Sequence, residues 1–220
     1  MARINISMRK IAIIGGGGFG QEVFCIWRDM LKNENVEYDF IGFFDDNNEL
    51  ASNLYGKVIG SLESLNQINY PLEVAIAIGN PQMLKIIKNK INNPNISFPN
   101  IIHPSVQLLD ANTVKMGQGN ILSLNVIFSC NCKVGNFNIF NTKATLGHDD
   151  NVGDFNVFSP NVQISGMVTI ENENFLGFNC GIIQKKNIGN KNVVGAGAIL
   201  LRSIKDEGTY IGVPAVKMKL

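Results

Sequence analysis

The chain has 220 residues with a formal net charge of +1, and 45% of its residues are hydrophobic. It is long enough to bury one large core or two small ones, and its charge gives no reason to expect nucleic acid or an anionic membrane as a partner. The apolar run Ile11–Ile14 is too short to span a bilayer, and Met1–Lys10 lacks the apolar region of a signal peptide, so we expect a cytoplasmic protein without membrane insertion.

The first hundred residues alternate predicted strands and helices. Strands are predicted at Lys10–Ile14, Tyr38–Phe44, Glu73–Ile78 and Ile96–Ile102, and helices at Gln21–Lys32, Ser61–Ile68 and Gln82–Ile91. This alternation predicts a parallel sheet that binds a nucleotide-type ligand at the carboxyl ends of its strands.

A glycine-rich turn, "IIGGGGFGQEV", joins the first strand to the first helix and contains the spacing Gly15-x-Gly17-x-x-Gly20. Glycines let a backbone approach phosphate oxygens, and a helix N-terminus supplies N–H donors and a positive partial charge. The acidic pair Asp45-Asp46 ends the next strand, as a nucleotide site requires. The alternative is a tight turn without a ligand. Two βαβαβ halves do not fit here, so a mononucleotide or nucleotide sugar is favoured over NAD, and a dehydrogenase is excluded.

The second half of the chain repeats every six residues. Apolar residues occupy fifteen successive sites at this spacing: Met116, Leu122, Phe128, Val134, Phe140, Leu146, Val152, Phe158, Ile164, Ile170, Leu176, Ile182, Ile188, Val194 and Leu200. Recurring Gly and Asn supply turn conformations that β-branched residues resist. Such hexads predict triangular coils of three short strands that stack into a β-helix, from about Pro104 to Leu201.

The four cysteines form no paired CxxC motif, and only two histidines accompany them. We therefore expect reduced thiols, no disulfide framework and no metal site. Cys130 and Cys132 are interpreted as core and strand residues of the repeat. His103 is interpreted as structural, because Pro104 forces an extended entry into the first coil.

Nine motifs in this order resemble the NeuD/PglD-like family, the sialic-acid O-acetyltransferases and bacillosamine/perosamine N-acetyltransferases. They are "IIGGGGFG", "FFDD", "IAIGNP", "IIHPSV", "GHDDNVGDF", "SGMVTI", "FLGFNCGI", "VVGAGAILL" and "IGVPAVKM". The resemblance implies an α/β Rossmann-like nucleotide-sugar-binding domain at residues 1–100. It implies an all-β left-handed parallel β-helix, the acetyltransferase domain with a C-terminal tail, at residues 101–220.

The resemblance also implies an activity. The expected enzyme is an acetyl-CoA-dependent N-acetyltransferase acting on the amino group of a nucleotide-linked amino (dideoxy) sugar, for surface polysaccharide or glycan synthesis. The expected assembly is a homotrimer with acetyl-CoA between adjacent prisms and no metal. Two alternatives stay open: an O-acetyltransferase of a sialic-acid-type sugar, and a non-catalytic nucleotide-sugar-binding module.

Acetyl transfer to an amine needs a base that titrates near neutrality, which indicates histidine, and His148 is the one histidine within the hexads. The resemblance makes His148 the general base and Asp149 the carboxylate that orients its imidazole. It makes Asn141 a polar residue of the same pocket.

The resemblance further assigns binding residues. It places the nucleotide sugar at Gly15, Gly17, Gly18, Phe19, Asp45, Asp46 and Gly79, and acetyl-CoA at Gly166, Phe178, Gly195 and Ala196. Three positions depart from the family pattern, in which His is common at Phe19, Cys at Asp150 and a second His at Val157. With Val157 present, a backbone N–H is expected to meet the oxyanion.

Overall fold

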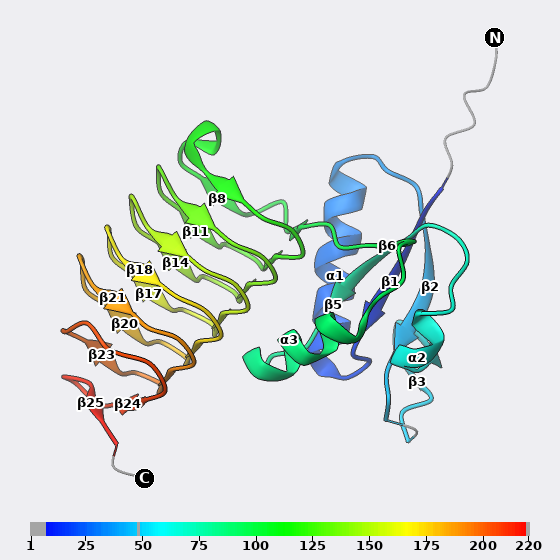
Figure 1. The fold of residues 1–220 in the computed structure, drawn as a ribbon. Helices are drawn as coiled ribbons and strands as arrows, with labels where there is room; N and C mark the ends of the chain where they lie inside the picture. The colour runs from blue at the N-terminus through cyan, green and yellow to red at the C-terminus, as the bar shows by residue number, and fades with distance from the viewer. Residues whose placement is uncertain (1–7, 48, 219–220) are drawn as a thin grey trace.

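The computed structural model describes residues 8–47 and 49–218. An α/β part is followed by a prism of stacked coils that stands beside it (Figure 1). The interpretation of Met1–Lys10 falls mostly outside the described residues. No helix in the described ranges is long and apolar enough to cross a membrane.

The α/β part is built on one six-stranded sheet with the order β3-β4-β2-β1-β5-β6. Its strands are β1 (Arg9–Ile14), β2 (Tyr38–Phe44), β3 (Ser52–Asn53), β4 (Gly56–Gly60), β5 (Leu72–Ile76) and β6 (Ile96–Ser97). All neighbours pair in parallel except β3 and β4. The predicted parallel sheet is confirmed, whereas the β3–β4 hairpin was not predicted.

Three helices accompany the sheet, α1 (Gly18–Asn33), α2 (Leu62–Leu65) and α3 (Pro81–Lys90). Helix α1 buries Val23, Ile26, Trp27, Met30 and Leu31, which recur at helical spacing along one stripe. Because β1 is central and covered on both sides, four of its residues are buried in succession.

The prism is a left-handed parallel β-helix with three faces. The docked face comprises β7 (Ile101–Ile102), β10 (Ile121–Leu122), β13 (Ile139–Phe140), β16 (Val157–Phe158), β19 (Phe175–Leu176), β22 (Val193–Val194), β24 (Thr209–Ile211) and β25 (Val216–Lys217). The middle face comprises β8 (Gln107–Leu108), β11 (Ile127–Phe128), β14 (Thr145–Leu146), β17 (Gln163–Ile164), β20 (Gly181–Ile182) and β23 (Ile199–Leu200). The polar face comprises β9 (Lys115–Met116), β12 (Lys133–Val134), β15 (Asn151–Val152), β18 (Thr169–Ile170) and β21 (Asn187–Ile188).

The chain runs through the docked, middle and polar faces in that order, so residues eighteen apart stack in register, as Ile121 does on Ile139. Fourteen of the fifteen hexad residues are buried, and Met116, the first of them along the chain, is half-buried. The predicted β-helix is therefore confirmed in its fold and its core.

The β-helix extends further than predicted at both ends. It begins at β7 rather than at Pro104, and a short 3₁₀ helix, Ala111–Thr113, stretches the first coil. Ile102 and Leu108 belong to the same stack. Leu108 and Met116 are eight positions apart instead of six, so the period of six does not reach the first two residues. Beyond Leu201, β24 adds a final docked-face strand.

Each hexad turns at a residue with left-handed backbone conformation, such as Asn125 and Asn131, as predicted. The structure also places Phe137, Phe155 and other large residues at these corners, none of them β-branched. A ladder of buried asparagines, not predicted, lines one corner at a spacing of eighteen: Asn120, Asn138, Asn156, Asn174 and Asn192. Their side-chain amides bond one another at 3.0–3.2 Å along the ladder, which satisfies polar groups inside the prism.

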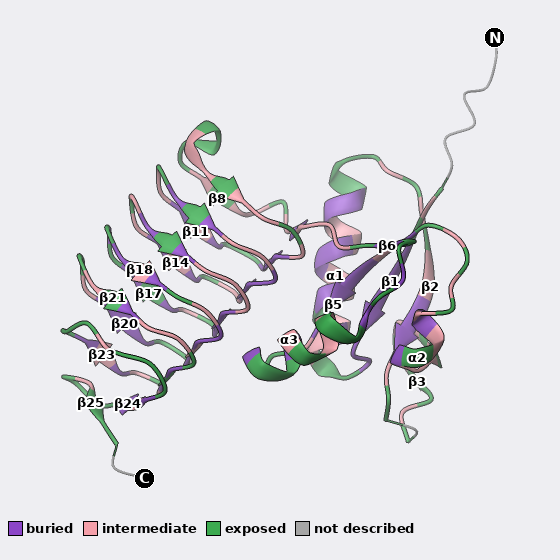
Figure 2. Ribbon diagram, in the orientation of Figure 1, coloured by how far each residue is buried: buried purple, intermediate pink, exposed green. Residues whose placement is uncertain are grey.

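The docked face packs against the α/β part. Its outward residues Ile121, Ile139 and Val157 are buried in the same hydrophobic cluster as the sheet and α1 (Figure 2). An ion pair of 2.5 Å between Lys85 on α3 and Glu173 adds a polar contact beside this cluster. The two parts of the chain therefore share one core along the docked face.

Candidate active site

The glycines of the turn fall into two groups. Gly15 has φ +97° and a Cβ there would lie 2.8 Å from the Ala77 carbonyl oxygen, while a Cβ at Gly20 would collide with the Gly15 carbonyl. The fold itself therefore requires these two glycines. At Gly17 and Gly18, by contrast, an added Cβ meets nothing within 4 Å. The space above these two residues is open to a ligand.

The first turn of α1 offers unpaired backbone donors to that space. Its N-cap, Gly17, makes no side-chain capping bond, and the first turn carries no acidic residue. Helices α2 and α3 are capped by the side chains of Ser61 and Asn80. Free N–H groups and the helix dipole together favour an anion at the start of α1.

Asp45 and Asp46 lie beside a cavity of about 190 Å³, next to Gly15 at the carboxyl ends of β1 and β2. Asp45 Oδ2 accepts the N–H of Gly16 at 2.8 Å, and Asp46 Oδ1 accepts that of Leu62 at 2.9 Å. Asp45 therefore braces the glycine turn and Asp46 the start of α2, and both line the small cavity.

The other two predicted acceptor-site residues lie elsewhere. Phe19 packs partly buried against the core, and the Cβ position of Gly79 is open. Neither residue lines the small cavity or the larger one described next.

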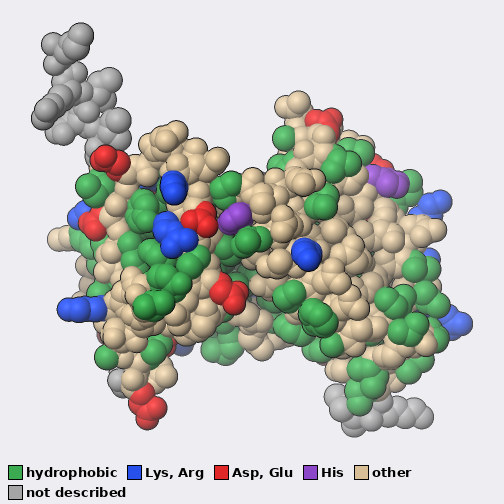
Figure 3. All heavy atoms as spheres, turned by 180° about the vertical axis from the view of Figure 1, so that it is seen from behind, with side chains coloured by type: hydrophobic (Ala, Val, Ile, Leu, Met, Phe, Trp, Pro, Cys, Tyr) green, Lys and Arg blue, Asp and Glu red, His purple; other side chains and the backbone are tan. Residues whose placement is uncertain are grey.

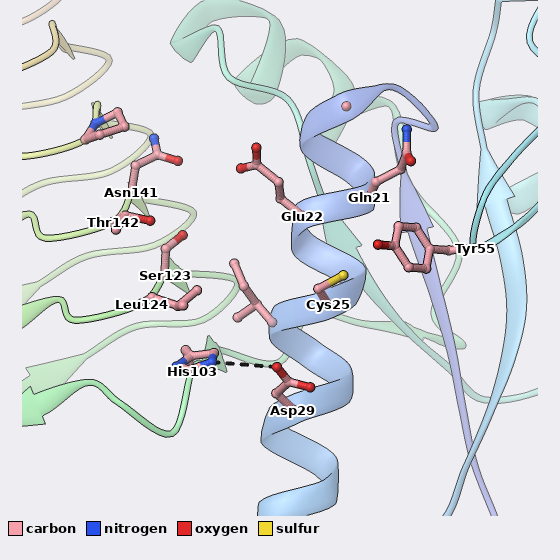
Figure 4. Close-up of a pocket in the computed structure, with 13 residues that line it drawn as sticks. Gln21, Glu22, Cys25, Asp29, Tyr55, His103, Ser123, Leu124, Asn141 and Thr142 are labelled. Carbon is pink, nitrogen blue, oxygen red and sulfur yellow. Dashed lines mark ion pairs between the residues drawn. The ribbon is translucent and has the colours of Figure 1, made fainter.

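A larger cavity of about 510 Å³ separates α1 from the docked–middle corner of the β-helix. It is lined by Gly18, Gln21, Glu22, Cys25, Ile26, Asp29, Tyr55, His103, Ser123, Leu124, Asn141, Thr142 and Pro160. Glu22 and Asn141 point toward one another across it (Figure 4). Seen from behind, the junction of the two parts is hollowed, with acidic and histidine side chains along it (Figure 3).

His103 has a structural role and also lines this cavity. Its Nδ1 accepts the N–H of Ser105 at 3.1 Å, which braces the first corner as expected. The same Nδ1 lies 2.7 Å from the Ser105 hydroxyl, and Nε2 faces Asp29 at 3.8 Å.

Of the α1 residues that line the cavity, sequence reasoning predicted only Gly18, as part of the nucleotide-sugar site. Gly18, Glu22, Cys25 and Asp29 follow one another at helical spacing and form one face of α1. Their polar character was visible in the sequence, but the side of α1 that meets the β-helix was not.

His148 lies on the middle–polar corner, in the turn after β14. Its Nδ1 is 2.7 Å from Asp149 Oδ2, and half of its side-chain surface is exposed. Hydrogen bonds from His148 and Asn131 hold the pKa of Asp149 below its usual range. The ionised carboxylate orients the ring and leaves Nε2 free to take a proton.

Gly166 lies one coil beyond His148 and under its ring. A Cβ at Gly166 would lie 2.5 Å from Nε2, so only glycine leaves room for the imidazole in this position. The glycine predicted to contact acetyl-CoA therefore also seats the proposed base.

The predicted site residues occupy two different corners of one chain. His148, Asp149 and Gly166 lie on the middle–polar corner, whereas Asn141, Phe178, Gly195 and Ala196 lie on the docked–middle corner. In a triangular prism the middle–polar corner is opposite the docked face. Asn141 and His148 therefore do not meet within a single chain, and a pocket that both line would need two chains.

The remaining candidates are buried. Val157 is 2% exposed on the docked face, within the shared core. Burial raises the pKa of the Cys132 thiol to about 11 and that of Cys180 to about 12, so both stay protonated near neutrality. The described residues contain no group of three or more side chains suited to a metal ion.

Residues 10–91 match the family model of the PglD N-terminal domain. The chain is also similar to the solved acetyltransferase domain of PglB from Neisseria gonorrhoeae, in complex with acetyl coenzyme A. The two are 28% identical with a TM-score of 0.83, and the match covers 96% of this chain and 100% of that one.

PerB from Caulobacter crescentus, in complex with CoA and GDP-perosamine, is 27% identical with a TM-score of 0.83 over 96% of this chain and 97% of that one. WeeI from Acinetobacter baumannii shares the fold at 23% identity, with a TM-score of 0.81 over 96% and 100% of the two chains. These matches confirm the predicted fold class and the resemblance to NeuD/PglD-like proteins.

Proposed function

We propose that this chain, a NeuD/PglD-like sugar acetyltransferase in fold and domain order, transfers the acetyl group of acetyl-CoA to the amine of a nucleotide-linked amino sugar. The complexes of PglB with acetyl coenzyme A and of PerB with CoA and GDP-perosamine support both substrates. The observation that carries the proposal is the Asp149–His148 pair on the surface of the β-helix, in which Asp149 holds Nδ1 of a half-exposed imidazole whose ring lies over Gly166.

The acceptor enters from the α/β part. Its diphosphate meets the open backbone of Gly17 and Gly18 and the uncapped start of α1. The sugar then extends along α1 into the larger cavity, toward Glu22 and Asn141. The glycine turn thus positions the acceptor, and bond formation occurs at the β-helix.

The reaction follows from these roles. The neutral amine attacks the thioester carbonyl, the C–N bond forms, and His148 Nε2 takes the proton that the nitrogen loses. The C–S bond then breaks, and the imidazolium returns the proton to the departing CoA thiolate. Asp149 holds the ring throughout, and a backbone N–H stabilises the oxyanion.

We propose that the base and the acceptor cavity come from neighbouring chains of a homotrimer. In this trimer the three middle faces are turned toward the threefold axis. The middle–polar corner of one prism then meets the docked–middle corner of the next. His148 and Gly166 of one chain then face Asn141, Phe178 and Ala196 of its neighbour, and acetyl-CoA lies between them.

The surface of the middle face supports this assembly. Its outward residues carry no charge, whereas the polar face presents Lys115 and Lys133; the six on the middle face are Gln107, Ile127, Thr145, Gln163, Gly181 and Ile199. Five exposed large hydrophobic residues lie along the two edges of the middle face: Leu109, Leu124, Met167, Phe178 and Leu201. Exposed apolar side chains along the edges of an uncharged face are typical of a contact between protein copies.

The assembly is tested by charging the middle face. We expect Ile127→Lys to lower the mass in light scattering from three times 24.1 kDa toward one chain and to abolish transfer. Lys133→Glu on the polar face is the matched control and should leave a trimer with native turnover. An Ile127→Lys protein that stays an active trimer would exclude the middle face as the contact.

The activity is tested by incubating the protein with acetyl-CoA and GDP-perosamine, the sugar that PerB binds. We expect CoA release and a product heavier by one acetyl group on nitrogen, with the free amino sugar a much poorer acceptor. Equal rates with and without the nucleotide would make the glycine turn structural, and acetylation of a hydroxyl would favour the O-acetyltransferase alternative. Binding of the nucleotide sugar without CoA release would indicate the non-catalytic module.

A further inference from the structure

A buried carboxylate, Asp150, lies inside the corner that carries His148. It occupies the inward corner position two residues before a hexad residue and has no exposed surface. Directly above and below it in the stack, the same position holds Cys132 and Val168, both buried. The β-helix therefore accepts an apolar residue here. Because burying a carboxylate without a cation costs free energy, folding alone gives no reason for an acid at this corner.

Asp150 redirects the backbone that leads into His148. At the adjacent rungs of the middle face, Ser129 and Ser165 donate their N–H groups to carbonyls of the next coil at 3.0 Å. The N–H of Gly147 instead turns inward and donates to Asp150 Oδ2 at 2.8 Å. The peptide immediately before His148 is thus held by a side chain.

The same carboxylate ties together the two turns that hold the imidazole. Asp150 Oδ1 accepts the N–H of Val168 at 2.8 Å, in the turn that contains Gly166. The Cys132 thiol donates to the Gly147 carbonyl at 3.2 Å, and the His148 carbonyl accepts from Met167 at 2.8 Å. The turn that carries the His148 imidazole and the turn that contains Gly166 are therefore both linked to the buried carboxylate of Asp150.

We infer that Asp150 is a positioning residue for His148, which fixes its corner and stabilises the imidazolium formed during acetyl transfer. This inference rests on the proposed function. The proton of the attacking amine goes to His148 Nε2, and at pH 8 Asp150 is ionised, keeps its two backbone hydrogen bonds and takes no proton. A charge in a buried site acts through a lower effective dielectric than the half-exposed Asp149, so its influence on the ring is less screened.

The pKa of Asp150 indicates that burying its carboxylate costs folding free energy. Burial raises its pKa to about 7, against the opposing effects of the Val168 and Gly147 N–H groups and of His148. Asp149 raises it further, and the Cys132 thiol beside it is neutral. Because the pKa is raised on folding, stability falls as pH increases from about 4 to about 7. A variant without this carboxyl escapes that loss.

The test is Asp150→Val, which takes the residue type of the coil below, with Asp150→Asn as a second variant. We expect kcat to fall about tenfold or more at pH 8 while both KM values change little. Thermal stability at pH 8 should be equal or higher, with a gain that shrinks toward pH 5. Asp154→Asn is the matched control, because Asn136 and Asn172 occupy its position in neighbouring coils. It should leave kcat unchanged.

A second measurement does not depend on turnover. The chain has only two histidines, so both imidazoles can be followed by NMR titration. In Asp150→Val we expect the midpoint for His148 to fall by about half a pH unit or more, since one stabilising charge is gone, while His103 stays unchanged. If wild-type protein transfers no acetyl group, the proposed function fails, and this titration still decides the inference.

Three outcomes would overturn the inference. The first is native kcat with lower stability at pH 8, which would make Asp150 a structural residue. The second is a His148 titration that does not move. The third is a valine variant that does not fold, because the inference holds that the β-helix does not need the carboxylate.

Discussion

Replacing His148 by alanine is expected to lower kcat by roughly 100- to 10,000-fold, the usual contribution of general acid–base catalysis. The imidazole is half-exposed and makes its side-chain hydrogen bond only with Asp149 among the described residues. Its loss should therefore leave the fold and the trimer intact. Acetyl-CoA should still bind, because its groove remains. Steady-state kinetics with both substrates saturating, together with calorimetric binding of acetyl-CoA, measure the two quantities.

Asp149→Ala is the companion variant and should cost less, since the carboxylate orients the ring and does not take the proton. A low pH should restore no activity in either variant. A His148→Ala enzyme with near-native kcat would remove this histidine from the mechanism, and loss of acetyl-CoA binding would make its role one of substrate binding.

Gly17→Val is expected to raise the KM for the nucleotide sugar by about 10- to 100-fold. Gly17 has φ −71° and ψ −169°, which valine can adopt, and its Cβ position is empty, so the variant should fold. A valine side chain would occupy the space of the phosphate and remove about one hydrogen bond to a charged group. Such a bond is worth about 1.5–3 kcal/mol, and 1.4 kcal/mol is a factor of ten.

The KM for acetyl-CoA should change little in Gly17→Val, because that groove lies on the β-helix. Gly17→Ala provides the graded control and should show a smaller increase for the nucleotide sugar. Equal weakening of both substrates, or none of either, would make the glycine turn a structural feature. Thermal unfolding of each variant shows whether the fold is retained.

The β-helix could be predicted almost completely, because its core repeats a single local rule. One inward apolar residue every six positions fixes strand, turn and face together. The rule failed only where Leu108 and Met116 are eight residues apart and beyond Leu200, since insertions shift the period without disturbing the stack. The asparagine ladder escaped notice because its spacing is one coil, eighteen residues, and not one hexad.

The α/β part was predicted in its order but not in its details. The β3–β4 hairpin pairs a two-residue strand with β4, a five-residue strand that begins and ends with glycine, so neither carries a clear hydrophobic alternation. Most helix and strand limits differ from the prediction by a few residues, as frayed ends usually do. The predicted strand Ile96–Ile102 is instead two strands, β6 in the sheet and β7 in the β-helix.

The site residues stay a prediction, and the sequence did not show which of them one chain brings together. Asn141 and His148 are seven residues apart, which in this β-helix places them on successive corners. Which face the α/β part covers depends on packing between Ile121, Ile139 and α1, and no local pattern encodes that choice. The sequence marked Asp150 only as a departure from the family pattern, and its burial became visible in the structure.

The central claim is that one chain supplies the base and its neighbour the acceptor site, and mixing two defective variants tests it most directly. His148→Ala and Gly17→Val chains are co-expressed in equal amounts and assayed at low nucleotide-sugar concentration. A site in a random trimer is intact only when one chain carries the base and its neighbour carries the intact turn. Each condition is met for half of the chains, so about one quarter of native activity should be recovered. If activity stays at the sum of the two separate variants, the base and the turn act within one chain, and the account is contradicted.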